Sequence, residues 1–157
     1  MSSLSPFIPS ARHVGIDDVP WVKNPAVNAQ MRLLQVDDDA NLYVTHGRLP
    51  AGLRVGTHRH TGPVLGFTLS GSWGYVENDF LNRAGSYLYE PVGSVHTLYV
   101  PDDNAEVTET LFAIYGDVEY LDPDGNVLFV SNARRNLDLY YEACEEAGLP
   151  RPNGILR

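Results

Sequence analysis

Two stretches of the chain decide the fold, GLRVGTHRH at residues 52–60 and GSYLYEPVGSVH at residues 85–96. Side chains alternate between the faces of a β-strand, so His58 and His60 are expected to point the same way, with Cα atoms roughly 7 Å apart. In the second stretch, Pro-Val-Gly predicts a turn that leads into a strand carrying His96. If the two strands lie side by side, the three imidazoles can converge on one metal ion.

A His-x-His pair alone is more often an ordinary core or surface pair, so the assignment rests on the flanking residues. These resemble the two motifs of the cupin superfamily. In the first motif Gly52 and Gly71 take the glycine positions, but Val64, or Leu65 at the longer spacing, stands where a glutamate ligand is usual. The residues that fall on the second motif are Gly85, Pro91, Gly93 and His96, with Val100 in place of its asparagine.

The resemblance implies an all-β cupin jelly-roll barrel that binds one divalent metal through His58, His60 and His96. The metal expected first is Fe(II), with Zn(II), Ni(II) and Mn(II) as alternatives. Because the motif glutamate is absent, the chain looks like the three-histidine dioxygenases, and in particular like the 2,4′-dihydroxyacetophenone dioxygenases and, more distantly, the acetylacetone-cleaving dioxygenases. Both split a carbon–carbon bond with O2.

Glu90 matches a glutamate that the acetylacetone-cleaving enzymes also carry six residues before the third histidine. By this resemblance Glu90 belongs to the catalytic site, where it would orient a ligand imidazole. The alternative is a carboxylate at the end of a strand that faces solvent.

Three neutral imidazoles would leave the ion its full charge and open coordination positions, which favours an anionic bidentate ligand. The enolate of a β-diketone or of an α-hydroxyketone meets that description. The expected function is therefore a non-haem Fe(II) dioxygenase that cleaves an enolisable ketone, with the ketone and O2 as its partners. Two alternatives stay open: a zinc-binding cupin that senses a ligand without catalysis, and a cupin isomerase. The sugar-acting cupin epimerases generally use a histidine and a tyrosine rather than a metal, so the complete ligand set counts against the isomerase.

Composition limits the other functions. With 11 Lys+Arg against 20 Asp+Glu, the net charge of −9 repels phosphate backbones and anionic lipids, so neither nucleic acid nor membrane is an expected partner. No apolar run approaches the ~18 residues of a spanning helix, and residues 1–10 lack the pattern of a secretion signal. We therefore expect a cytoplasmic protein. Cys144 is the only cysteine, which excludes a disulfide within the chain.

Short segments rich in β-branched and aromatic residues, separated by Gly, Pro, Asn and Asp, predict antiparallel strands in a sandwich or jelly roll. A single cupin domain is expected over residues 1–157, with an irregular N-terminal arm at 1–28, a barrel at 29–131 and a helix within 132–148. Residues 78–83 are expected to form a turn. The predicted strands are 31–36, 42–49, 64–70, 73–77, 85–90, 95–100, 107–115, 118–121 and 127–130.

The C-terminal helix is predicted to begin at an Asn136 cap and to run to about Ala147, with Gly148 ending it. It is expected to pack on the exterior of the barrel. His46 lies in the middle of a predicted strand, where it could face the cavity, but a histidine satisfied in the core or at the surface is the better interpretation.

Strand parity carries two further expectations. If Val64 points inward, then Leu65, Phe67 and Leu69 point outward. Such an apolar outer face needs a cover, either the N-terminal arm or another subunit, and a homodimer is predicted. Parity also separates Tyr87 and Tyr89 from Leu88 and Glu90, so that only one of these pairs can line the cavity. The aromatic residues considered for an aryl-sized pocket are Phe67, Trp73, Tyr75, Tyr87, Tyr89 and Tyr99.

Overall fold

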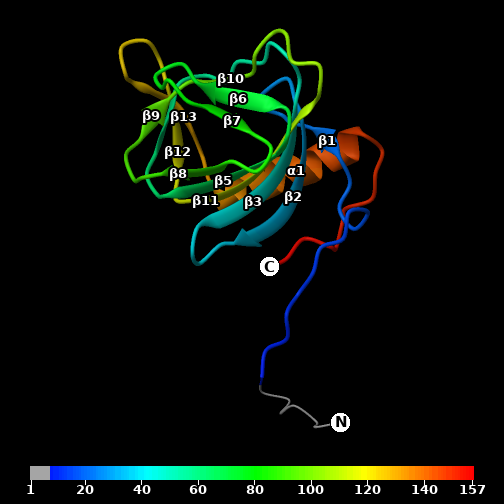
Figure 1. Ribbon diagram of the computed structural model, residues 1–157. Coiled ribbons are helices and arrows are strands. Elements are labelled where there is room, and N and C mark those ends of the chain that lie inside the picture. The colour runs from blue at the N-terminus through cyan, green and yellow to red at the C-terminus, as the bar shows by residue number, and fades with distance from the viewer. Residues whose placement is uncertain (1–7) are drawn as a thin grey trace.

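The computed structural model describes residues 8–157, so the first seven residues of the predicted arm lie outside the described part. Within the described residues the chain forms thirteen strands and one helix (Figure 1). The strands are β1 (Val22–Lys23), β2 (Gln30–Asp37), β3 (Leu42–Leu49), β4 (His58–His60), β5 (Val64–Ser70), β6 (Ser72–Tyr75), β7 (Leu81–Arg83), β8 (Tyr87–Glu90), β9 (Val95–His96), β10 (Leu98–Tyr99), β11 (Thr108–Tyr115), β12 (Val118–Leu121) and β13 (Val127–Ser131), and the helix is α1 (Ala133–Glu146).

The strands form a jelly roll, which confirms the predicted fold class. A six-stranded sheet in the order β1-β2-β3-β11-β5-β8 faces a four-stranded sheet in the order β13-β12-β4-β9, and a smaller sheet, β10-β6-β7, closes one end. All the pairings within these sheets are antiparallel. Such sheets bury one face and leave the other toward solvent, so each long strand has an inner and an outer set of side chains.

The run at 95–100 is two strands rather than the one predicted. β9 pairs with β4 in the four-stranded sheet, whereas β10 pairs with β6 in the small sheet. Thr97 lies between them, and its backbone N–H donates to the Glu77 carboxylate at 2.8 Å instead of to a backbone carbonyl of a neighbouring strand. The segment at 78–83 also differs from the prediction, because its last three residues form β7 and only the residues before them turn the chain.

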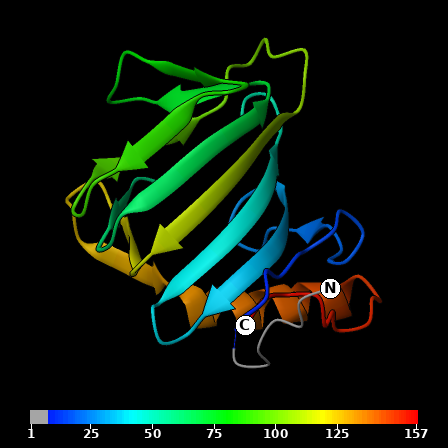
Figure 2. The same cartoon turned by 60° about the horizontal axis from the view of Figure 1, so that its bottom comes forward.

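The inner and outer faces of β5 follow the predicted parity. Val64, Gly66 and Thr68 are buried, whereas Phe67 and Leu69 are 45% and 47% exposed. Figure 2 looks onto the six-stranded sheet, and no other element crosses β8, β5 and β11 in this view.

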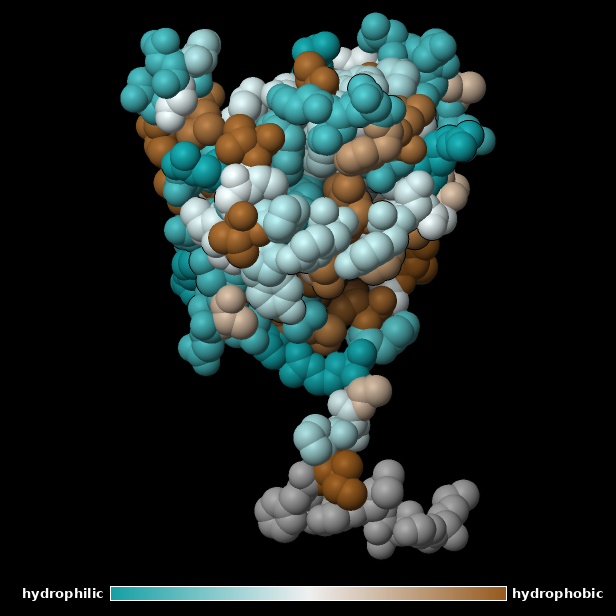
Figure 3. All heavy atoms as spheres, turned by 60° about the vertical axis from the view of Figure 1, so that its left-hand side comes forward, coloured by the Kyte–Doolittle hydropathy of each residue, from teal (hydrophilic) through white to brown (hydrophobic). Residues whose placement is uncertain are grey.

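A second group of exposed apolar residues lies on the edge strand β13. Brown, hydrophobic atoms interrupt the polar surface on the side of the molecule that Figure 3 shows. The exposed apolar residues of β13 are Val127, Leu128, Phe129 and Val130.

Helix α1 begins four residues earlier than predicted. Asn132 is its N-cap, and the Asn132 side chain accepts a hydrogen bond from the backbone N–H of Arg135 at 2.9 Å. Asn136 has the right residue type for a cap, but its amide instead donates to Ser131 Oγ and to the carbonyl of Asn132. The buried stripe starts at Ala133, but its first large apolar residue is Leu137, which is why the pattern alone places the start too late. Gly148, at φ +70°, follows the helix end as expected.

The helix packs on the inner side of β2 and β3, so the prediction of an exterior position is wrong. Its buried residues Leu137, Tyr140 and Cys144 share one core cluster with Leu33 and Tyr43. Tyr43 also lines the barrel interior, together with residues from the first turns of α1. The helix thus closes part of the interior instead of covering the outside. No helix among residues 8–157 is long and apolar enough to cross a bilayer.

The arm follows the β2 edge of the large sheet, where β1 pairs with β2 and Val19 and Val22 join the core cluster of the helix. Trp21 lies on the outer face of this sheet. The guanidinium of Arg48 lies 3.8 Å from the centre of the Trp21 ring, and Trp21 meets the His46 ring edge-on. His46 is hydrogen-bonded on both nitrogens, to Arg32 at 3.1 Å and to Glu109 at 2.9 Å. His46 is therefore the satisfied histidine that the sequence analysis favoured.

Replacing Asn132 with Ala should lower the free energy of unfolding by about 1 kcal/mol, because the first turn of α1 loses the acceptor for its free N–H groups. Urea unfolding followed by circular dichroism measures this change. Asn132→Ser keeps an acceptor and should stay close to the wild type. Equal losses in both variants would contradict the assignment of Asn132 as the cap.

Candidate metal centre

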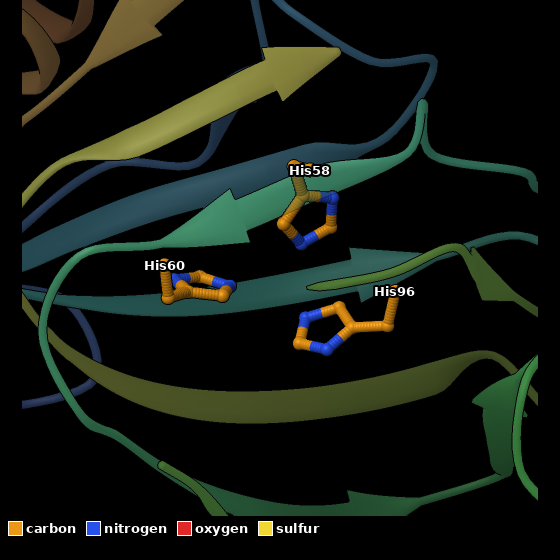
Figure 4. Close-up of side chains that lie close together, drawn as sticks. All are labelled: His58, His60 and His96. Carbon is orange, nitrogen blue, oxygen red and sulfur yellow. The ribbon is translucent and has the colours of Figure 1, made fainter. Parts of the chain in front are cut away.

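The three predicted histidines lie together inside the barrel. His58 and His60 come from β4 with one residue between them, and His96 is the cross-strand partner of His58 on β9. All three side chains are buried, and one donor nitrogen from each lies within 4.8 Å of the others. Figure 4 shows the rings turned toward a common space. The predicted convergence is therefore present, while the role of these residues as ligands stays a prediction.

His58 is oriented by the backbone. Its Nδ1 lies 2.8 Å from the carbonyl oxygen of Gly56, which can only accept a hydrogen bond. The proton of the neutral ring is therefore on Nδ1, and the lone pair of Nε2 remains free for a ligand bond.

Burial keeps the three rings neutral. Desolvation and the neighbouring His58 ring lower the pKa of His96 to about 3, and desolvation with both neighbouring rings lowers the pKa of His60 to about 3. Burial lowers the pKa of His58 as well. Near neutral pH, the cluster therefore offers unprotonated nitrogens, as metal binding requires.

Glu90 lies inside the same site, so the alternative of a solvent-facing carboxylate is wrong. The side chain is buried, and Oε2 lies 3.1 Å from His60 Nε2 and 3.5 Å from His96 Nε2. Neither approach is a hydrogen bond, and both Oε2 and His96 Nε2 have no hydrogen-bond partner among the described residues. The Tyr75 hydroxyl donates to the other oxygen, Oε1.

Glu90 is also the cross-strand partner of Val64, the residue that replaces the motif glutamate. The carboxylate thus comes from the neighbouring strand at the same level of the sheet. Burial raises the pKa of the Glu90 carboxyl to about 7, although the hydrogen bond from Tyr75 acts to lower this pKa.

Tyr75 supports the site from one side. Its ring stacks on His96 with centroids 3.9 Å apart and an interplanar angle of 18°. Trp73 makes edge contacts with both Tyr75 and Phe112. An aromatic wall therefore runs from the histidines to β11.

The site opens into a cavity of about 450 Å³. A volume of this size is typical of sites for small organic ligands. The wall near the histidines is mostly apolar, and the arm and α1 contribute its outer parts. Its apolar lining residues include Leu49, Val55, Val64, Leu98, Phe112, Ile114 and Val118.

Four aromatic residues outside the predicted set line the cavity: Tyr43, Phe112, Tyr120 and Phe129. Tyr120 lies 5.4 Å from His58 between ring centroids, and Phe129 stacks on Tyr120 at 4.4 Å. The Asp122-Pro-Asp-Gly turn predicted the hairpin that carries Tyr120 and Phe129, but it did not show which face of that hairpin points inward. Of the aromatic residues that were considered, Tyr75 lines the cavity, whereas Phe67, Tyr87 and Tyr89 face outward.

The donor set fits a divalent metal ion. Three neutral imidazoles converge in a buried position, and an unpartnered carboxylate oxygen lies beside them. Nitrogen and oxygen donors of this kind suit Fe(II), Zn(II), Ni(II) and Mn(II), and the residues do not select one of these metals.

Fold and site together define a cupin with a buried three-histidine cluster. The sequence matches the family of ChrR cupin-like domains over residues 10–119, and the chain belongs to this family. No curated protein matches the sequence at a significant level.

Solved structures share the cupin fold of this chain. An RmlC-like cupin from Ralstonia eutropha is 27% identical over 94% of this chain and 95% of its own, with a TM-score of 0.86. A second protein from that organism, of unknown function and with a cupin-like fold, is 32% identical over 87% of this chain and 86% of its own, with a TM-score of 0.80. An acetylacetone dioxygenase from Acinetobacter johnsonii shares the fold at 18% identity, over 91% of this chain and 99% of its own, with a TM-score of 0.77.

Changing His58, His60 or His96 to Ala should abolish stoichiometric binding of a divalent metal, because each removal leaves too few donors. Glu90→Ala should weaken binding by a smaller amount, about 10- to 100-fold, as expected for a group that supports the ligands. Zn(II) titration by calorimetry, with circular dichroism as a check on folding, measures both effects. The exposed His13→Ala is the matched control. Full metal binding by the folded histidine variants would disprove the site.

Proposed function

We propose that this protein is a non-haem Fe(II) dioxygenase that cleaves a carbon–carbon bond of an enolisable ketone with O2. The substrate would resemble 2,4′-dihydroxyacetophenone or a β-diketone. The observation that carries the proposal is a cluster of three buried, neutral histidines that opens into a largely apolar cavity of about 450 Å³.

The donor set supports this chemistry over a structural metal site. A closed structural zinc site takes four protein ligands, whereas three histidines converge here, and the adjacent Glu90 carboxylate is tied to Tyr75 through Oε1. An ion held by His58, His60 and His96 would keep positions for an anionic substrate. Fe(II) bound there would supply a Lewis acid for the enolate and the redox chemistry for O2.

The surrounding residues have supporting roles in the proposed reaction. Gly56 fixes the tautomer of His58, and the Tyr75 ring fixes the plane of His96. Glu90 accepts a hydrogen bond from Tyr75 and places its other oxygen beside His60 and His96, where its negative charge would stabilise a bound cation. The apolar wall excludes water from a ligand held at the histidines, which strengthens the electrostatic interactions there.

A zinc-binding ligand sensor is the second candidate. It is favoured by the family to which the chain belongs, because that family is named for ChrR, and ChrR of Rhodobacter sphaeroides is an anti-sigma protein. Three neutral imidazoles also bind zinc well, and the general order of metal affinities does not favour Fe(II). The two candidates share the site and differ in whether O2 is consumed.

Oxygen uptake separates the two candidates. Protein loaded anaerobically with Fe(II) should consume O2 when it is offered 2,4′-dihydroxyacetophenone or a β-diketone from a panel that also contains thiols and flavonols. His58→Ala should show no uptake above free Fe(II). Absence of uptake with every ketone, in protein that retains zinc from purification, would reject the dioxygenase in favour of the sensor.

We also propose that the outer face of β8, β5 and β11 is covered by a second copy of the chain. Cross-strand partners form contiguous rows across these strands, and none of the row members is charged. The row members are Tyr89, Leu65 and Ala113 in one row and Tyr87, Phe67 and Leu111 in the next. A flat apolar face that repeats in each copy suits a two-fold interface, in which the same patch meets itself.

Phe67→Asp should convert the dimer into a monomer, because the charge would be buried without a partner at the centre of the patch. Light scattering coupled to size-exclusion chromatography gives the mass directly. Val76→Asp, which changes an exposed valine just beyond β6, should leave the dimer intact. A monomeric wild type would refute the proposal.

A further inference from the structure

The cavity reaches the surface where β13 leads into α1. Exposed residues line the cavity in two places, at the arm and at this junction, and the junction is the one close to the histidines. Ser131 is two strands away from His60 in one cross-strand row, so their Cα atoms are about 10 Å apart. A parallel row contains His58, Tyr120 and Phe129. Phe129 is 50% exposed, so a ligand can enter or extend through this rim.

A single basic side chain lies at this rim. Arg135 is exposed, and it is the only Lys or Arg among the described residues that line the cavity. Glu90 is the only carboxylate in the same lining, and it lies beside the histidines. A ligand that extends from the histidines to the rim therefore meets a positive charge with no carboxylate next to it.

Arg135 also has no carboxylate partner elsewhere in the described chain. Its neighbour Arg134 forms an ion pair with Asp138 at 3.4 Å, whereas none of the ion pairs among residues 8–157 involves Arg135. Both arginines lie in the first turn of α1, which has no acidic residue and where the helix dipole disfavours a cation. Asp138 offsets this cost for Arg134 only. The charge of Arg135 therefore does not stabilise the helix and is available to an external anion.

Tyr120 adds a hydroxyl donor between the histidines and the rim. Its ring centre lies 5.4 Å from that of His58 and 4.4 Å from that of Phe129. Burial raises the pKa of the Tyr120 hydroxyl, and no hydrogen bond contributes to this rise. The hydroxyl therefore keeps its proton at neutral pH and can donate it to a ligand.

A carboxylate is the ligand group that suits these donors. A guanidinium presents N–H groups in a planar fork that matches the two oxygens of a carboxylate, and a phenol O–H can donate to the same oxygens. The net charge of −9 repels anions from the protein as a whole. A local cation such as Arg135 is therefore what would allow an anionic ligand to enter this cavity.

We propose that Arg135 and the Tyr120 hydroxyl form a second subsite at the rim, which binds a carboxylate at the far end of the ketone ligand. This inference deepens the proposed function and rests on it for the position of the ketone end at the histidines. It narrows the ligands to enolisable ketones that carry a distal carboxylate, in place of neutral ketones. Arg135 is then a residue that determines specificity, and Phe129 provides an apolar contact for the chain between the two ends.

The test compares two β-diketones, 4,6-dioxoheptanoate and heptane-2,4-dione. They share one carbon chain and differ in a single terminal group, a carboxylate in the first and a methyl in the second. Binding to Zn(II)-loaded protein is measured by calorimetry, without any turnover. Wild type should bind the dioxo acid about 10-fold more tightly, as expected for a hydrogen-bonded pair of charged groups.

The variants assign this preference to the rim. Arg135→Gln should remove the preference and leave the affinity for heptane-2,4-dione unchanged, whereas Tyr120→Phe should reduce the preference only in part. Arg134→Gln is the matched control, because Arg134 is the adjacent arginine, does not line the cavity and is paired with Asp138. It should keep the full preference. Added salt should weaken binding of the dioxo acid by wild type and leave binding of the neutral diketone unchanged.

Equal affinity of wild type for the two probes would overturn the subsite, and so would a preference that Arg135→Gln retains or that Arg134→Gln loses equally. None of these results depends on O2 consumption. Equal binding of both probes with O2 uptake would reject the subsite and keep the dioxygenase. A preference that depends on Arg135, without O2 uptake, would keep the subsite and reject the dioxygenase.

Discussion

The antiparallel pairing of β4 with β9 is the constraint on which the candidate site depends. It sets His58 opposite His96, and strand parity then brings His60 to the same inner face. Two strands distant in sequence thereby deliver three imidazoles to one buried point without any contribution from a flexible loop. Because the ladder fixes the backbone of both strands, the distances among the rings follow from the fold itself. The burial that accompanies the pairing also keeps the rings neutral.

The same sheet geometry explains how a carboxylate reaches the site although the motif glutamate is missing. Val64 and Glu90 are partners across β5 and β8, so a side chain at either position enters the interior at the same level. Glu90 differs from a glutamate at position 64 in how its carboxylate is held. The Tyr75 hydroxyl donates to one oxygen of Glu90, and the other oxygen lies beside His60 and His96. The third histidine and the carboxylate then belong to one short segment, 90–96.

Much of this arrangement could be predicted from the sequence. The spacing of His58, His60 and His96 with their flanking glycines predicted the jelly roll and the convergence of the rings, and the alternation along β5 predicted which residues face outward. These features depend on local periodicity, which a sequence shows directly. The inward position of Glu90 could not be predicted in the same way, because parity relates it to Leu88 and Tyr89 but does not say which face is inside.

The features that were missed depend on pairing between distant segments. Tyr120 and Phe129 enter the cavity because β12 pairs with β4. Tyr43 and Phe112 line it because β3 and β11 pair with each other. The cap of α1 could not be chosen between two asparagines of equal propensity, since the choice follows from the contacts of Ser131 and Asn136. None of these pairings leaves a periodic signal within a single segment. The motifs therefore define the histidine end of the cavity, while the registers of β3, β11 and β12 define which side chains line the rest of it.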